Sequence, residues 1–414
     1  MELQFLGGAS EVGRSSFLLK GSKRILLDHG IKLNEKTEYP GEAKDVDACI
    51  LSHAHIDHSG FVPYLYKEVF PTTYGTAPTK ELSQLLINDS MKIAMKRHTA
   101  QKFSKRQLKM FTERFAAYEF GEEIAFGEYS IKLHDAAHIS GSAITSIEHK
   151  NRTLVYTGDF KLDEQGLQGS AEIVKSNILI TESTYADREH PDRKELIRKF
   201  IDEIKGVIDD GGTALIPVFA VGRAQEIVKV LYDHNLADIS YLDGMAKKAT
   251  EIVLRYPGFC ANIGALQAAM KKITRLGEEV SRSHIGAGQE VIVTTAGMLN
   301  GGPVLEYITR LNQRSRIFLT GYQVEGTNGR KVLDGRPITI RGKKQLIKTP
   351  VSYYDFSAHA GKSDLYEYAR KSSPETVICV HGERASAEQL AEGLKLEGFD
   401  AKVPSRGETI KLDF

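Results

Sequence analysis

Cysteine is scarce in this chain, and long hydrophobic runs are absent. The three cysteines, Cys49, Cys260 and Cys379, lie far apart without a CxxC pattern, so we expect neither a disulfide framework nor a cysteine zinc site. No apolar run approaches the roughly 18 residues of a membrane span. The N-terminus lacks the basic start and apolar stretch of a secretory signal. We therefore expect a cytoplasmic protein without a membrane partner.

An excess of charge of one sign is also missing. The 55 lysines and arginines balance 54 acidic residues, which leaves a formal net charge of +1 at pH 7. The charge of the whole molecule would therefore not steer a nucleic acid, which would have to meet a local basic surface. One basic stretch contains Lys92, Lys96, Arg97, His98, Lys102, Lys105, Arg106 and Lys109. A solvated helix face is the favoured interpretation of this stretch.

The 414 residues are enough for two domains. Up to residue 188, short β-rich runs surround an amphipathic helix over Thr79 to Lys96, which predicts a layered α/β domain. From about Arg193, helices and strands alternate, which predicts βαβ units around a parallel sheet. Short strands then return at Ile338 to Arg341 and Gln345 to Thr349. We predict a domain over residues 189–336 inserted between two parts of the first domain, residues 1–188 and 337–414.

The strongest chemical pattern is the segment SHAHIDH, which follows the apolar run Ala48 to Leu51. Three imidazoles and a carboxylate this close together are hard to explain by packing, because each buried ring would need a partner. In a loop, His53 and His55 can point one way while Asp57 and His58 point another, which suits two adjacent metal ions. Two ions need more ligands, which are expected at strand ends. The candidates there are His138, Asp159 and His381.

These motifs resemble the metallo-β-lactamase superfamily, with HAHIDH, Asp28 in LLDHG, His138 and Asp159 as the matching residues. The later segments ESTY from Glu182, FSAHAG around His359 and VHGE around His381 resemble motifs A, B and C of its β-CASP nuclease branch. PVFAVGRAQE, YLDGMA, TTAGMLNGGP and GYQVEGTNGRKVLDG match as well. The resemblance covers essentially the whole chain. It implies an α/β fold, a metallo-β-lactamase αββα sandwich with an inserted parallel-sheet β-CASP domain.

The resemblance also implies a site with two Zn²⁺ per chain. The implied ligands are His53, His55 and His138 for one zinc ion and Asp57, His58 and His381 for the other, with Asp159 bridging. Asp28 resembles the carboxylate that orients a ligand histidine. Glu182 and His359 resemble the pair that handles the leaving group. Asp57, Asp28, Glu182 and His359 are thus the expected catalytic set.

The implied activity is zinc-dependent hydrolysis of RNA. Two neighbouring zinc ions lower the pKa of water, so that hydroxide can attack phosphorus and leave 5′-phosphate and 3′-hydroxyl ends. The FSAHAG motif resembles the cleavage and polyadenylation specificity factor subgroup, in a short archaeal or bacterial form without KH domains, which favours endonucleolytic cutting of single-stranded RNA. The alternatives are a 5′ to 3′ exoribonuclease like RNase J, a thioester hydrolase of the same fold, and an inactive scaffold.

Four basic residues of the inserted domain are the expected RNA contacts. Arg223, Lys247, Lys248 and Arg330 lie beside glycine-rich turns at predicted strand ends, where ligands of α/β sheets collect. The glycine-rich loop GMLNGGP, which begins at Gly297, is either a mobile loop or a close approach to phosphates. The oligomeric state is open, with a homodimer as one option.

Overall fold

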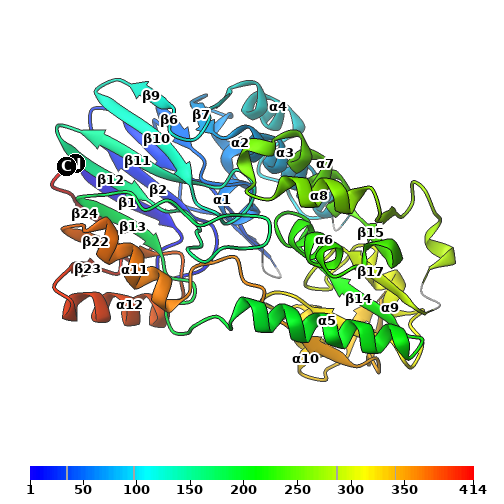
Figure 1. Ribbon diagram of the computed structural model, residues 1–414. Coiled ribbons are helices and arrows are strands. Elements are labelled where there is room, and N and C mark those ends of the chain that lie inside the picture. The colour runs from blue at the N-terminus through cyan, green and yellow to red at the C-terminus, as the bar shows by residue number, and fades with distance from the viewer. Residues whose placement is uncertain (34–35, 97, 286–287, 341) are drawn as a thin grey trace. The chain divides into compact units, whose positions relative to one another are not determined.

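The computed structural model describes residues 1–33, 36–96, 98–285, 288–340 and 342–414 (Figure 1). The chain divides into two compact units. Unit 1 contains Met1–Glu164, Gly169–Glu189 and His359–Phe414, and unit 2 contains Gln165–Gln168 and His190–Ala358. Arg97 of the basic stretch and Arg341 of a predicted strand lie outside the described residues. Over the described part of the chain, no helix combines the length and the apolar character needed to cross a membrane.

The first sheet of unit 1 has seven strands in the order β24-β1-β2-β3-β6-β7-β8. Its strands are β1 (Glu2–Gly7), β2 (Ser16–Lys20), β3 (Arg24–Leu27), β6 (Ala48–Ile50), β7 (Thr72–Gly75), β8 (Phe115–Ala117) and β24 (Thr409–Lys411). Pairing is antiparallel among β24, β1, β2 and β3, and parallel from β3 to β8. A small hairpin follows β3, with β4 (Lys32–Leu33) and β5 (Thr37–Glu38).

The second sheet of unit 1 has the order β23-β22-β13-β12-β11-β10-β9. Its strands are β9 (Glu123–Phe126), β10 (Tyr129–Asp135), β11 (Ala143–His149), β12 (Arg152–Tyr156), β13 (Ile178–Glu182), β22 (Thr376–Val380) and β23 (Asp400–Lys402). β12, β13, β22 and β23 are parallel to one another. The carboxyl ends of β12, β13 and β22 therefore meet at one edge of the sheet.

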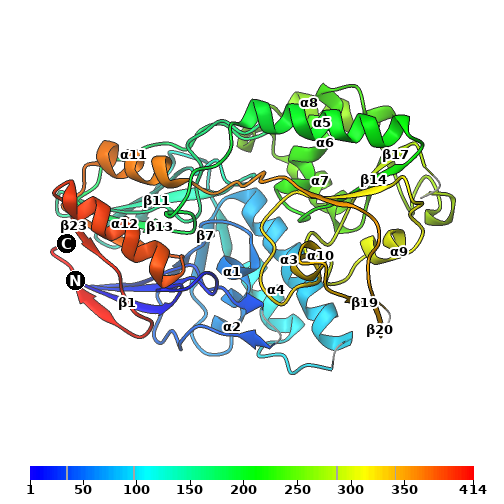
Figure 2. The ribbon, with the colours of Figure 1, turned by 90° about the horizontal axis from the view of Figure 1, so that it is seen from below.

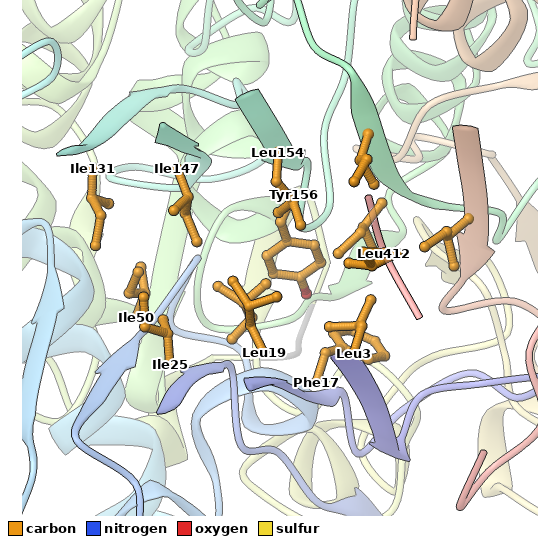
Figure 3. Packing of buried hydrophobic residues seen from close by; sticks show 14 of the residues in the cluster. Leu3, Phe17, Leu19, Ile25, Ile50, Ile131, Ile147, Leu154, Tyr156 and Leu412 are labelled. Atoms are coloured by element: carbon orange, nitrogen blue, oxygen red, sulfur yellow. The ribbon is translucent and has the colours of Figure 1, made fainter. Parts of the chain in front are cut away.

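The two sheets of unit 1 pack face to face around one apolar core (Figure 3). Side chains alternate between the two faces of a strand, so Leu154 and Tyr156 of β12 point into this core while Val155 packs on the outer side. Helices cover both outer faces. Their bounds are α1 (Ile56–Ser59), α2 (Val62–Leu65), α3 (Ala77–Lys96) and α4 (Lys105–Glu113) for the first sheet, and α11 (Lys362–Ser372) and α12 (Arg384–Leu396) for the second. Figure 2 shows α11 and α12 beside the second sheet. The predicted αββα sandwich is confirmed.

Unit 2 is built on a six-stranded parallel sheet with the order β16-β15-β17-β14-β18-β21. Its strands are β14 (Thr213–Pro217), β15 (Ser240–Asp243), β16 (Thr274–Arg275), β17 (Glu290–Thr294), β18 (Arg316–Leu319) and β21 (Val351–Tyr353). Its helices are α5 (Arg193–Asp209), α6 (Arg223–Asp233), α7 (Met245–Arg255), α8 (Ile263–Met270), α9 (Val304–Ile308) and α10 (Asn328–Leu333). The predicted parallel sheet is confirmed.

The chain departs from the predicted elements after residue 336. β19 (Ile338–Ile340) and β20 (Lys343–Gln345) form a two-stranded sheet. The predicted strand Gln345 to Thr349 is wrong, because residues 346–349 belong to no strand and the Leu346 side chain is exposed. Unit 2 runs on to Ala358, whereas the predicted inserted domain ends at residue 336, because β21 pairs with β18 and so belongs to the sheet of unit 2.

Candidate metal centre and hydrolytic site

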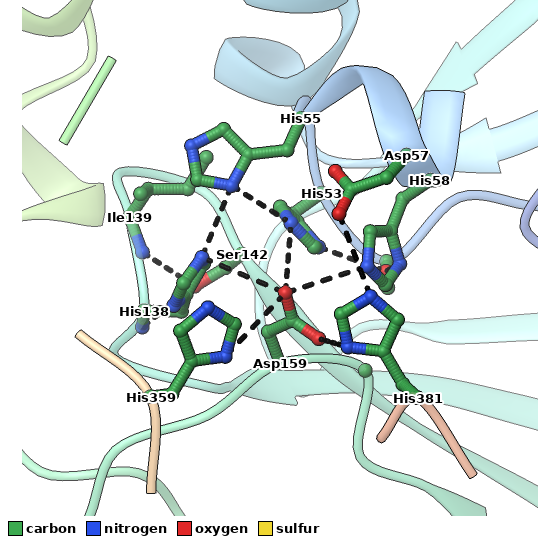
Figure 4. Close-up of polar contacts among 12 residues, drawn as sticks. His53, His55, Asp57, His58, His138, Ile139, Ser142, Asp159, His359 and His381 are labelled. Carbon is green, nitrogen blue, oxygen red and sulfur yellow. Dashed lines mark hydrogen bonds and ion pairs between the residues drawn. The ribbon is translucent and has the colours of Figure 1, made fainter. Parts of the chain in front are cut away.

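Nine polar residues of unit 1 converge at the edge where the strands of the second sheet end, and Figure 4 labels all of them except Glu182. They come from the β6–α1 segment (His53, His55, Asp57, His58), the β10–β11 loop (His138), the loop after β12 (Asp159), the end of β13 (Glu182), the loop before α11 (His359) and the loop after β22 (His381). The parallel register places Glu182 opposite Val380, the residue before His381. Six segments, several of them remote in sequence, therefore supply one site.

The backbone at this edge is locally strained. Asp28, Ala137 and His381 adopt φ values of 56°, 53° and 47°. Residues other than glycine rarely take this left-handed backbone conformation, which costs on the order of 1–3 kcal/mol per residue. It persists only where the surrounding contacts enforce it. Such residues cluster at functional sites. The strain is therefore consistent with an edge shaped for chemistry rather than for stability.

The first donor group contains His53, His55, His138 and Asp159. His55 Nδ1 lies 3.2 Å from His53 Nε2 and 3.1 Å from His138 Nε2. Asp159 Oδ2 lies 3.5 Å from His53 Nε2 and 3.8 Å from His138 Nε2. Zinc bonds of 2.0–2.1 Å in a tetrahedron place the donors about 3.3–3.4 Å apart. The spacing of these four donors fits one such ion.

The second donor group contains Asp57, His58 and His381. His381 Nε2 lies 3.4 Å from Asp57 Oδ2, and His58 Nε2 lies 3.3 Å from Asp159 Oδ2. The other oxygen of Asp159 lies 3.2 Å from His381 Nδ1. Asp159 thus faces both groups, which is where a bridging ligand must lie.

Unsatisfied polar atoms indicate that this cluster holds a cation. Among the described residues, His58 Nε2, His381 Nε2 and Asp159 Oδ1 are buried without a hydrogen-bond partner. Buried polar atoms are nearly always satisfied, because leaving one unpaired is costly. Three such atoms in one cluster of imidazoles and carboxylates are best explained by a metal ion. The residues present therefore fit a metal site.

The electrostatics of His53 and Asp159 agree with this interpretation. Burial, helped by the neighbouring His58, lowers the pKa of the His53 ring well below its usual range, although Asp159 opposes the shift. Burial raises the pKa of Asp159, but His381 and His58 outweigh it and hold that pKa well below its usual range. A neutral imidazole and an ionised carboxylate are the forms that bind a metal.

Asp28 is the hub that orients His58. Its carboxylate accepts hydrogen bonds from the Ser52 backbone N–H (2.7 Å), the Ser52 hydroxyl (2.7 Å) and the Tyr156 hydroxyl (2.6 Å). It also lies 2.7 Å from His58 Nδ1. When the proton is on Nδ1, Nε2 has a free lone pair that can bind a metal ion. A carboxylate behind a ligand histidine sets its tautomer and ring orientation in this way. This placement supports the role predicted for Asp28.

Glu182 and His359 form a separate pair beside the metal ligands. His359 Nδ1 lies 2.9 Å from Glu182 Oε2, and the other Glu182 oxygen accepts the Phe160 backbone N–H at 2.9 Å. His359 Nδ1 is also 3.8 Å from Asp159 Oδ2. Burial lowers the pKa of His359, but Glu182 and Asp159 outweigh it and raise that pKa to about 9. The two carboxylates therefore favour the protonated form of the ring.

The four predicted RNA contacts lie in unit 2, and they differ in exposure. Arg223 and Lys247 are buried, and the Lys247 ammonium donates to the Leu276 carbonyl and pairs with Glu278 at 3.0 Å. Lys248 and Arg330 are exposed, although Arg330 pairs with Asp334 at 3.1 Å. Contact with RNA stays a prediction for all four, and exposure favours Lys248 and Arg330.

Two hydrogen-bond donors to Asp28 were not predicted from the sequence. Ser52 and Tyr156 both donate to Asp28, and each is the residue next to a recognised motif. Ser52 precedes HAHIDH, and Tyr156 precedes TGD. Period-2 alternation places Tyr156 in the core, but it does not reveal that its hydroxyl reaches Asp28, which is 128 residues away.

Comparison with known proteins agrees with the fold and with a metal-dependent hydrolase. Residues 346–404 match the family described as Zn-dependent metallo-hydrolase RNA specificity domain, residues 224–332 match the Beta-Casp domain, and residues 1–207 match the anti-Pycsar protein Apyc1. A solved structure of a protein of unknown function from Enterococcus faecalis shares the fold, with a TM-score of 0.65 and 16% identity over 99% of each chain.

Relatives with assigned names are similar over most of their length. The chain is 37% identical to a probable RNase, MJ4, of Methanocaldococcus jannaschii, over 100% of both proteins. It is 33% identical to the RNase aCSPSF2 of Saccharolobus solfataricus, over 99% of this chain and 85% of the relative. Together with the αββα sandwich and the His/Asp cluster, these similarities show that the chain belongs to the β-CASP ribonucleases, hydrolases with the metallo-β-lactamase fold.

Proposed function

We propose that this chain is an endonuclease for single-stranded RNA that works with two zinc ions. The observation that carries the proposal is a set of seven donors: one group of His53, His55, His138 and Asp159, and a second of Asp57, His58 and His381 that also faces Asp159. The Glu182–His359 pair lies beside Asp159. A site for one ion would leave the second group, Asp57, His58 and His381, without a purpose.

In this proposal, the ligands of the two zinc ions come from the two donor groups. His53, His55 and His138 would hold one zinc ion, Asp57, His58 and His381 the other, and Asp159 would bridge. Two zinc ions bound there would polarise the scissile phosphate and lower the pKa of water. Asp28 contributes by fixing the orientation and tautomer of His58.

His359 has the leaving-group role in this proposal. As a water-derived oxygen bonds to phosphorus, the bond from phosphorus to the 3′ oxygen breaks, and that oxygen needs a proton. With Nδ1 engaged by Glu182, we assign His359 Nε2 as the atom that delivers the proton. The products are a 5′-phosphate and a 3′-hydroxyl.

The preference for internal cutting rests on motif B. FSAHAG resembles the cleavage and polyadenylation subgroup more than RNase J, which favours an endonuclease over a 5′ to 3′ exonuclease. The thioesterase alternative leaves Glu182 and His359 without a role, and the relatives named as RNases argue against it.

A circular single-stranded RNA tests the mode of cutting, because it offers no end. We expect the purified protein to linearise the circle and to leave a 5′-phosphate on the product. A linear RNA of the same sequence with a 5′-monophosphate is the matched substrate. If the circle survives while the linear RNA is degraded, the protein is an exonuclease and the endonuclease assignment is wrong.

A further inference from the structure

A buried ion pair lies behind the loop that carries His359. Lys161 Nζ is 3.0 Å from Asp364 Oδ2, and the two residues are 5% and 8% exposed. Lys161 follows Asp159 by two positions, and Asp364 lies in the first turn of α11. Lys161 also lies 3.3 Å from Asp163, whose side chain is 72% exposed. Asp364 is therefore the buried partner.

The pair is held in apolar surroundings. Phe160 and Leu365, which are chain neighbours of Lys161 and Asp364, belong to one hydrophobic core cluster together with Ala360, the residue after His359. Removing two charges from water costs free energy, and apolar residues of similar volume often serve stability as well or better. Stability alone is therefore a weak reason for placing an ion pair here, and a role in the nearby site is the stronger explanation.

The hydrogen bonds of Asp364 connect the ion pair to the loop that carries His359. The oxygen of Asp364 that meets Lys161 also accepts the Gly361 backbone N–H at 3.1 Å, two residues after His359. Glu182 bonds His359 Nδ1 directly and also accepts a hydrogen bond from the backbone N–H of Phe160. The loop after β12 therefore reaches the His359 loop twice, through Phe160 and Glu182 and through Lys161 and Asp364.

We propose that Lys161 and Asp364 are positioning residues that fix His359 relative to Asp159. One short segment then sets both the proposed bridging ligand and the proposed proton donor, so that the two keep a constant separation. This inference rests on the leaving-group role proposed for His359. It assigns the pair no contact with RNA or metal.

The test is the double variant Lys161→Met/Asp364→Asn, compared with the parent protein. The Asp364→Asn change keeps an acceptor for the Gly361 N–H, while the two changes together remove both buried charges. We expect kcat on single-stranded RNA to fall about 10- to 100-fold, since small misplacements of a reacting group cost up to about 10²-fold. The KM, the zinc content and the melting temperature should stay close to those of the parent. Lys161→Arg, which retains a cation, should keep most of kcat.

Lys371→Met is the matched control, because Lys371 pairs with Glu367 on the exposed surface of the same helix, α11. Its kcat should equal that of the parent. A parent-like kcat in the double variant overturns the positioning role. A double variant that fails to fold, or whose melting temperature falls together with kcat, overturns it as well, because the pair would then be structural.

A double-mutant cycle with His359→Ala separates the two proposals. If the ion pair acts through His359, removing the pair from the His359→Ala protein should cause no further loss of rate. A full additional loss contradicts the inference. A parent-like rate of His359→Ala itself contradicts the proposed function, whatever the Lys161 variants do.

Discussion

At the scale of single residues, the proposed site separates the groups that would hold metal from His359, which would serve the leaving group. Seven donors lie in two groups, whereas His359 Nδ1 lies 2.9 Å from Glu182 Oε2 and forms a third group with Glu182 and Asp159. Both kinds of histidine lie within one cluster, so proximity alone does not distinguish their roles. A variant that removes one function and spares the other does distinguish them.

His359→Ala should slow RNA cleavage about 10²- to 10⁴-fold, the range for a lost general acid, while zinc stays bound. Single-turnover cleavage rates and zinc analysis of the same preparation provide the measurement. His134→Ala is the control, because His134 bonds Glu172 and Ser146 outside the cluster, and its rate should match the parent. Loss of zinc from His359→Ala would show that the residue is a ligand.

At the scale of elements, α1 is only four residues long and depends on its neighbours for its position. The Ser15 N–H donates to the Asp57 carbonyl at 2.8 Å, and the His29 N–H donates to the His58 carbonyl at 2.8 Å. A Cβ on Gly30 would lie 1.7 Å from the Asp57 carbonyl oxygen. Contacts from Ser15 and from the segment after β3 therefore hold Asp57 and His58, two of the proposed ligands.

Gly30→Ala should lower the stability of the protein by about 1–3 kcal/mol or more, because the added methyl group has no space. It should weaken zinc binding as well, since Asp57 and His58 must move. Thermal unfolding and chelator competition measure the two effects. Gly206→Ala is the opposite case, because it lies within α5 with open space around it, and we expect it to stabilise by about 0.4–1 kcal/mol. Unchanged zinc affinity in Gly30→Ala would contradict the role of this contact.

The elements that could be predicted are those with a local pattern. The amphipathic spacing from Thr79 to Lys96 corresponds to α3, and the alternation after Arg193 corresponds to the parallel sheet of unit 2. The strand placed at Gln345 to Thr349 failed because two adjacent apolar residues, Leu346 and Ile347, look like a strand but have no partner to pair with. Strand pairing is a tertiary property, which a local pattern does not contain.

The same limit applies to the site. His53, His55, Asp57 and His58 stand in one motif, so their association is visible in the sequence. The pair of Lys161 and Asp364 spans 203 positions. No spacing rule links two such residues, and only the folded chain reveals their contact.

At the scale of the whole molecule, both proposed metal ions and His359 belong to unit 1, although His359 follows the whole of unit 2 in the chain. The site therefore requires that the chain return to unit 1 after the inserted unit, with His359 and His381 on the returning segment. The second donor group thus needs residues from both Met1–Glu164 and His359–Phe414.

Elemental analysis of protein purified without added metal tests for a site with two zinc ions. We predict two zinc ions per chain in the parent and in the His134→Ala control, and fewer in His381→Ala, which lacks a ligand of the second group. Cleavage of RNA should disappear as a chelator lowers the zinc content and return when zinc is restored. A stable content of one zinc ion per chain with full cleavage activity would contradict the account.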